Sequence, residues 1–240
     1  MIWRSLISSS LLSFSLLSAA NGAEVVGQVS LRDSREASVA RGAGFSGVVV
    51  SLEPLDAPGS SVPPPARAVM VQKSKTFTPH VLPVQAGATV DFPNYDPIFH
   101  NAFSSYSGQV FDVGLYRPGS SRSVRFGRPG VVRVFCNIHP NMSAIILVVN
   151  SPYFAKTGPD GRFKLTVPPG RYQMRVFHER ATAATLDALT KTIQVEARGW
   201  ESPPIVISEA GYLPAPHSNK YGQPYPPVGD DGSVYPGVRK

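Results

Sequence analysis

Several features that often indicate function are scarce or missing from this chain of 240 residues. It contains one cysteine, Cys136, so it cannot form an internal disulfide. The formal net charge is +7, but lysine and arginine are scattered rather than clustered, which argues against a nucleic-acid partner. No G-x-S-x-G, H-E-x-x-H or phosphate-loop motif is present. These absences favour a protein that is not an enzyme.

The N-terminal residues are typical of a secretory signal peptide. Residues 1–23 have an early positive charge at Arg4, an apolar and serine-rich run, and small residues at the end, "SAANGA". We expect cleavage between Ala20 and Ala23, and no stable membrane insertion, because no later stretch is apolar enough to span a bilayer. No cysteine lies in this segment to carry a lipid anchor. The mature protein is therefore predicted to be periplasmic or secreted, where burial or a metal must protect Cys136 from oxidation.

The composition predicts an all-β protein. The chain has 24 prolines and 21 glycines, and short valine-rich runs alternate with turn residues. We expect a first domain over residues 24–150, with its first strands between 24 and 54. A second, smaller β-sandwich is expected over 151–210, with one short helix within 179–191. Residues 211–240, rich in proline, glycine and tyrosine, are expected to form an extended or disordered tail.

The most regular part of the first domain predicts a β-hairpin. Apolar runs flank "QAG" at residues 85–87, which indicates two strands joined by a turn. Antiparallel pairing about this turn would place His80 opposite Phe92. Both residues would then lie at the end of the sheet from which the chain continues to His100.

A group of potential metal ligands lies on the loop "CNIHPNM", between the predicted strands "VVRVFC" and "SAIILVVN". Cysteine thiolate and imidazole suit copper, and copper accepts a thioether that zinc and magnesium seldom use. Cys136, His139 and Met142 would need a second imidazole to complete a trigonal copper site, and His100 can supply it. The other interpretation is that Cys136 is a buried core thiol and the histidines are surface residues.

Two segments carry a family resemblance: "FTPHVLPVQAGATVDFPNYDPIFHNAFS" and "FGRPGVVRVFCNIHPNMSAIILVV". Over about residues 70–150 the chain resembles the cupredoxins, the small blue copper proteins such as plastocyanin and amicyanin. The Cys-x2-His-x2-Met spacing is similar to that of amicyanin, and exported proteins labelled as methylamine-utilisation proteins are also similar. The resemblance implies a Greek-key cupredoxin sandwich that binds copper. Separately, "DGRFKLTVPPGRYQMRVFH" resembles a carboxypeptidase regulatory-like or prealbumin-like β-sandwich, which implies a binding or spacer module.

The predicted ligand set indicates electron transfer. His100, Cys136 and His139 with an axial Met142 leave a metal no open position for substrate, unlike catalytic sites. The resemblance implies that the ring edge of His139 reaches the surface and passes electrons to a redox protein partner, and that Asn101 ties the two ligand loops together. The alternative is a carrier or structural binding protein in which copper is cargo or absent.

The remaining histidines divide into two groups. His80 could be a solvated or hydrogen-bonded residue at the start of a strand, which is the outcome we expect, or a further ligand that weakens Met142. His178 and His217 lie outside the cupredoxin-like segments and are expected to have no part in the site.

Overall fold

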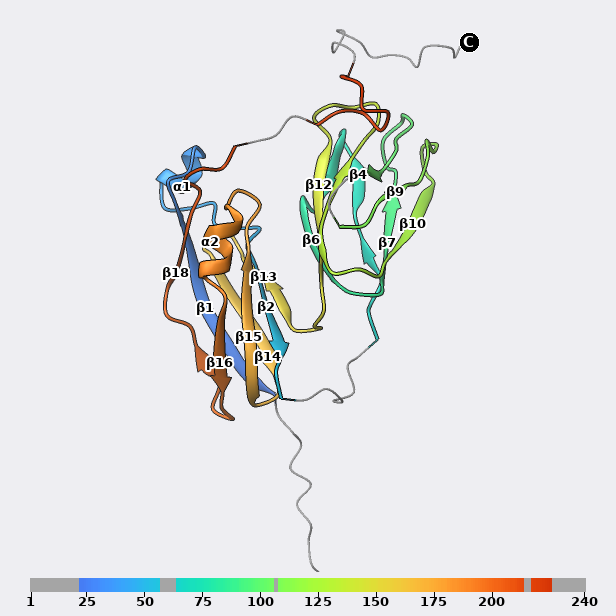
Figure 1. The fold of residues 1–240 in the computed structure, drawn as a ribbon. Coiled ribbons are helices and arrows are strands. Elements are labelled where there is room, and N and C mark those ends of the chain that lie inside the picture. The colour runs from blue at the N-terminus through green and yellow to red at the C-terminus, as the bar shows by residue number, and fades with distance from the viewer. Residues whose placement is uncertain (1–21, 57–63, 106–107, 214–216, 226–240) are drawn as a thin grey trace, which may run out of the picture.

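The computed structural model describes residues 22–56, 64–105, 108–213 and 217–225. The described chain is nearly all β, which confirms the expected fold class. It forms two β-sandwiches that lie beside one another (Figure 1). We call them the split sandwich, built from both ends of the described chain, and the inserted sandwich, which lies between those ends in sequence.

Two sheets make up the split sandwich, and their inner faces enclose one apolar core. The strands of the first sheet are β1 (Ala23–Arg32), β14 (Arg162–Val167), β17 (Trp200–Glu201) and β18 (Ile205–Ser208). The second sheet contains β2 (Val49–Pro54), β13 (Phe154–Lys156), β15 (Gly170–Phe177) and β16 (Lys191–Val195). Alternate residues of β14 and β15 are buried, as expected for strands with one face on a core. The short helices are α1 (Ala37–Ala40) and α2 (Ala183–Ala188), and α2 confirms the helix expected there.

The expected domain boundary is wrong at its N-terminal side. Residues 24–54 were expected to complete the sandwich that holds Cys136, but β1 pairs with β14 and β2 pairs with β15. Val25 lies opposite Leu165, and Val50 lies opposite Val176. The alternation of apolar residues along these strands indicates which face of each strand is buried. It does not indicate which other strands pair with them or which sheet packs on that face. The segment that resembles the cupredoxins is thus an insertion between β2 and β13.

The inserted sandwich has a sheet of three strands facing a sheet of five. The first contains β3 (Ala68–Val69), β7 (Ala88–Pro93) and β10 (Ser121–Phe126). The second contains β6 (Val81–Gln85), β8 (Phe103–Ser104), β9 (Phe111–Asp112), β11 (Gly130–Phe135) and β12 (Ser143–Val149). A small hairpin, β4 (Val71–Lys73) and β5 (Thr76–Thr78), adjoins them. β12 is buried along almost its whole length, as its continuous apolar sequence predicted.

The predicted hairpin at residues 85–87 is also wrong. β6 pairs in parallel with β12, and β7 pairs with β10 in the other sheet. The turn crosses between the sheets: the N–H of Ala86 donates to Val149 O at 2.8 Å, and that of Gly87 to Phe126 O at 2.6 Å. Gly87 has φ +93°, a conformation that few other residues adopt. Sequence signals for a tight turn therefore marked a corner of the sandwich rather than a hairpin.

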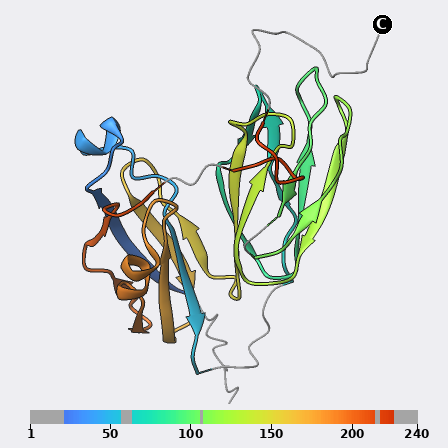
Figure 2. The same ribbon diagram turned by 45° about the horizontal axis from the view of Figure 1, so that its top comes forward.

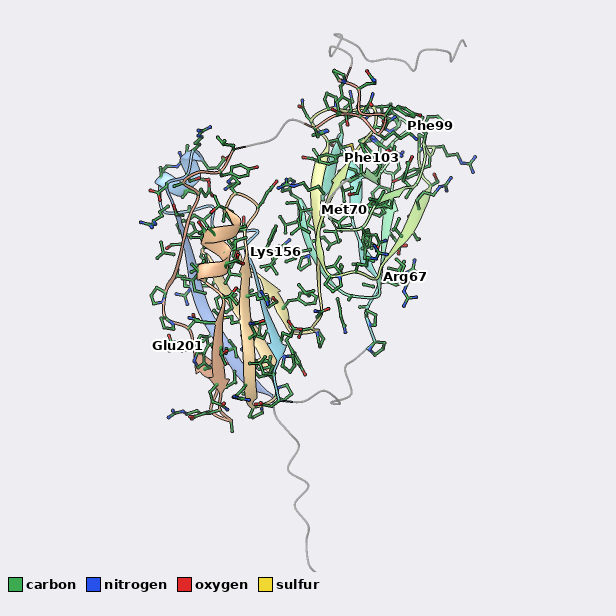
Figure 3. The ribbon with its side chains drawn as sticks, viewed as in Figure 1. Arg67, Met70, Phe99, Phe103, Lys156 and Glu201 are labelled. Atoms are coloured by element: carbon green, nitrogen blue, oxygen red, sulfur yellow. The ribbon has the colours of Figure 1, made fainter. Side chains whose placement is uncertain are left out.

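A third apolar cluster joins the two sandwiches. Val49 of β2 packs there with Val81, Ile145 and Leu147 of the inserted sandwich. Lys156, which lies between the sandwiches in Figure 3, donates from Nζ to Val81 O at 3.2 Å. Because apolar side chains of both units are buried in one cluster, the units are packed together and not only tethered.

The N-terminus of the described chain is already part of the fold. Ala23 lies in β1 opposite Val167 and is 2% exposed, so the expected signal-peptide boundary at residue 23 reaches into the first strand. Residues 1–21, on which most of that expectation rests, lie outside the described residues. In the described part of the chain, no helix is long and apolar enough to span a membrane.

Candidate metal centre

The loop between β11 and β12 brings three of the predicted ligands together. Cys136 follows β11 directly, and its N–H donates to Met142 O at 3.1 Å. The N–H of Met142 donates to His139 O, also at 3.1 Å. These bonds close a compact turn, because the flanking strands are paired up to Phe135 and Ser143.

His100 arrives from the other side, on the segment that follows β7. Its backbone pairs with Tyr116: the N–H of His100 donates to Tyr116 O at 3.2 Å, and the reverse bond is 2.9 Å. Tyr116 is buried, and its hydroxyl donates to Phe92 O at 2.9 Å. Asn94 holds the intervening loop by donating to Ile98 O and accepting from the N–H of Asp96. The segment is therefore fixed at both ends.

The side chains converge on one point. Nδ1 of His100 lies 3.9 Å from Sγ of Cys136, and Nδ1 of His139 lies 3.5 Å from the same sulfur. The two imidazole rings are 4.9 Å apart between centroids. One donor atom from each of the three residues lies within 4.8 Å of the others. His100 and Cys136 are fully buried, and His139 is partly buried.

Met142 lies in the same core cluster as Cys136 and has no exposed surface.

His80 lies away from this group of side chains: its Nε2 contacts Glu179 Oε2 at 2.6 Å, and its Nδ1 contacts Ser143 O at 3.1 Å. It is at the ligand end of β12, but it reaches that position through the parallel β6–β12 pair and not through the predicted hairpin. His178 is buried in the split sandwich, with Nε2 2.8 Å from Glu209 Oε1.

Asp96 is the residue at this site that sequence reasoning missed. Its Oδ2 accepts a hydrogen bond from Nε2–H of His100 at 2.7 Å, so Nδ1 of the ring is left unprotonated and faces the sulfur. A carboxylate behind a metal-binding histidine commonly fixes the tautomer in this way. The signal available in the sequence was a carboxylate four residues before the predicted ligand.

The hairpin β4–β5 supports Asp96. Its two-residue turn, Ser74 and Lys75, has φ +54° and +55°, and both N–H groups donate to the Asp96 carboxylate at 2.5 and 2.8 Å. Burial alone would raise the pKa of Asp96, but these N–H groups and His100 together lower it. Burial lowers the pKa of His100 despite the nearby carboxylate. The site therefore presents a neutral imidazole backed by an ionised acid.

Without a metal, burial keeps the Cys136 thiol protonated. Burial raises the pKa of Cys136, against the opposing effect of backbone N–H groups of Ile138, Asn101 and His139. Those groups favour the thiolate, which a bound metal ion stabilises far more strongly. The backbone N–H of Asn101, the residue after His100, is thus directed at the Cys136 sulfur on the other ligand loop, and the Asn101 side chain donates to Asp112 Oδ1 at 2.7 Å.

His217, which was expected to have no part in the site, lies against the residue that precedes Cys136. Its ring stacks on Phe135 with a centroid distance of 4.1 Å. It belongs to residues 217–225, which cross the ligand end of the inserted sandwich (red in Figure 2). These nine residues of the expected tail form no helix or strand but pack against the inserted sandwich, while residues 226–240 lie outside the described chain.

No family model matches the chain, and no curated protein matches it. Among solved structures, a purple cupredoxin from Nitrosopumilus maritimus matches 34% of this chain and 99% of its own, with 23% identity and a TM-score of 0.32. A reduced amicyanin variant matches 35% of this chain and 82% of its own, with 20% identity and a TM-score of 0.33. A copper-containing nitrite reductase from Thermus scotoductus matches 40% of this chain but only 25% of its own, with 25% identity and a TM-score of 0.34.

The donor set itself fits copper. Two imidazole nitrogens and one thiolate sulfur are the ligands of trigonal copper sites, in which a methionine is often the weak axial ligand. His100, Cys136 and His139 meet this requirement through their own geometry, and Met142 is on the same loop. A structural zinc site would need four strong ligands, and the residues described here bring three such donors together.

Proposed function

We propose that this protein binds one copper ion through His100, Cys136 and His139, with Met142 as an axial ligand, and transfers electrons. The observation that carries the proposal is the convergence of two imidazole Nδ1 atoms on one buried thiol. A core thiol with unrelated surface histidines would not be expected to show this arrangement, nor a carboxylate that fixes the proton of His100 on the far ring nitrogen.

When bound, copper would supply a one-electron couple between Cu(II) and Cu(I). The protein's contribution is rigidity. His100 is held by Asp96 and by its backbone pair with Tyr116, and Cys136 is held by backbone N–H groups and by its bond to Met142 O. Ligands fixed in this way would move little between the two charge states, and with Met142 as a fourth ligand they would leave no position for a substrate. We therefore propose a carrier of electrons and not an enzyme.

The partner that we propose is a redox protein of the periplasm or the extracellular space. His139 is the ligand that is not fully buried. On the segment that leads to His100, Tyr95 is 64% exposed and Phe99 is 40% exposed, and Phe99 lies at the ligand end of the inserted sandwich (Figure 3). Exposed aromatic side chains of this kind favour a protein docking surface. Export follows from the signal-peptide features of the sequence.

The split sandwich is proposed to be a binding or spacer module, similar to carboxypeptidase regulatory-like domains. The pattern that supports this is the Pro-Pro-Gly turn between β14 and β15, with alternating buried residues on both strands.

A second candidate function is copper carriage. It rests on the same proposed copper ligands as electron transfer and differs in that the copper ion would be released.

The test is the spectrum of the copper-loaded protein. We expect an intense visible thiolate-to-copper band, its loss in Cys136→Ser with the fold kept, and weakened copper binding in His100→Ala and His139→Ala. His178→Ala is the matched control and should leave the band unchanged, because His178 is bound to Glu209 in the other sandwich. Copper bound without the band, or a band that survives Cys136→Ser, would contradict the assignment. A copper ion that is bound but never reduced or reoxidised reversibly would favour carriage.

A further inference from the structure

Residues 217–225, which we call the strap, contact the loop that carries three of the proposed ligands. The hydroxyl of Tyr225 donates to the carbonyl oxygen of Cys136 at 2.7 Å. The backbone N–H of Lys220 donates to Oδ1 of Asn137 at 2.9 Å. Two consecutive residues of the ligand loop are therefore bonded to a segment that follows them by more than 80 positions.

The strap also reaches the other side of the site. Nζ of Lys220 forms an ion pair with Asp112 at 2.8 Å, and Asp112 accepts a hydrogen bond from Asn101, the residue after His100. His217 stacks on Phe135, the residue before Cys136, and meets the ring of Tyr225 edge-on at 5.2 Å. The strap thus contacts residues next to both His100 and Cys136, which lie on the two segments that carry the proposed ligands.

The strap has its own local order but is weakly attached. Asn219 closes a turn by accepting from the N–H groups of Tyr221 and Gln223, and the N–H of Asn219 donates to Gln223 O at 2.9 Å. Among the described strands, none pairs with the strap, and no strap residue belongs to an apolar core cluster. A segment held by a few side-chain contacts can open without unfolding the sandwich beneath it.

We propose that the strap is a cover over the Cys136–Met142 loop that controls access to the Cys136 thiol and to the metal that this loop binds. When the strap is closed, Tyr225 and His217 lie against the backbone and the ring that flank the thiol. When it opens, the loop loses contacts at Cys136 and Asn137 and becomes accessible from the solvent. The part of this proposal that concerns metal exchange rests on the copper function proposed above, whereas the part that concerns the thiol does not.

The first experiment measures the reaction of Cys136 in the metal-free, full-length protein with an aromatic disulfide reagent. Cys136 is the only cysteine, so the colour released reports on that residue alone. Tyr225→Phe removes one hydrogen bond and should increase the rate about 2- to 10-fold, because labelling follows the opening equilibrium. His217→Ala removes the stack on Phe135 and should act similarly. If the two effects multiply, the double variant should label roughly 4- to 100-fold faster, and because the two rings contact one another, a departure from that product measures their coupling.

The matched control is Tyr221→Phe, which removes a hydroxyl from the same segment. Tyr221 is 71% exposed; the change removes a bond of its side chain to Lys220 within the strap and keeps the cation–π contact of its ring with Lys220. It should label at the wild-type rate, and circular dichroism should show every variant folded. Wild-type rates in both Tyr225→Phe and His217→Ala would overturn the proposal, as would an equal acceleration in Tyr221→Phe.

The second experiment measures how fast the same variants take up Cu(II) and lose Cu(I) to an excess of chelator. Uptake and loss should accelerate together by about the same factor as thiol labelling, since both require the same opening. Accelerated labelling with unchanged copper rates would overturn control of metal exchange. If the wild-type protein binds no copper, the proposed function fails, while the labelling rates still decide whether the strap covers the thiol.

Discussion

Asp96→Ala would remove the group that holds His100, and the structure sets the size of the effect. His100 is fully buried, so its Nε2–H would be left without an acceptor, at a cost of about 1–3 kcal/mol. The N–H groups of Ser74 and Lys75 lie on an exposed turn where water can replace the carboxylate, which adds on the order of 1 kcal/mol. We expect the metal-free protein to lose about 2–4 kcal/mol of unfolding free energy, a large part of the usual 5–15 kcal/mol.

Two natural probes can follow this loss in each sandwich separately. Cys136 is buried in the inserted sandwich, so the rise in its labelling along a urea series, above the rate that strap opening sets without urea, reports the unfolding of that unit. Trp200, the only tryptophan after residue 23, reports the split sandwich by fluorescence. Asp96→Ala should shift the Cys136 transition and lower copper affinity about 10- to 100-fold, because the tautomer of His100 is no longer fixed.

The matched control is Asp91→Ala, which removes a carboxylate from the same sandwich. Asp91 pairs with Arg67 on the surface, and such pairs contribute about 1 kcal/mol or less. Asp96→Asn, which keeps one acceptor oxygen, should fall between the wild type and Asp96→Ala. A wild-type Cys136 transition together with wild-type copper affinity in Asp96→Ala would refute the role given to Asp96.

Two further predictions concern the contacts outside the metal centre. The hydrogen bond between His80 and Glu179 raises the pKa of His80 in the folded protein. This pair therefore stabilises the packing of the two sandwiches fully below about pH 6.5, the pKa of an unfolded histidine, and loses that effect as the pH rises through the higher pKa of folded His80. His80→Ala should remove that pH dependence, worth at most about 1 kcal/mol for a half-exposed pair, and leave the copper spectrum intact. Glu209→Ala leaves a buried imidazole and a guanidinium without their acceptor and should destabilise the split sandwich by about 3 kcal/mol. The Trp200 transition should then shift much more than the Cys136 transition, and equal shifts would show that the two sandwiches unfold as one unit.

The proposed ligands on the loop could be predicted from sequence because they are local. Cys136, His139 and Met142 lie within seven residues between two apolar strands, so the chain brings them together whatever the rest of the molecule does. The buried character of β12 was equally visible, because a continuous apolar run needs cover on both faces. His100 was inferred from the need for a second imidazole and from family resemblance.

The tertiary structure alone decided which segments meet. β1 pairs with β14 more than 130 residues away, β6 and β7 separate into different sheets, and the strap crosses the ligand loop. The hydrophobic pattern of a strand specifies which face is buried, but its backbone hydrogen-bonding groups are the same as those of every other strand. Loop-closure entropy does little to favour near partners, since each doubling of loop length costs only about 0.6 kcal/mol. The partner is therefore chosen by how well whole faces pack together, which is a property of the folded chain and not of any one segment.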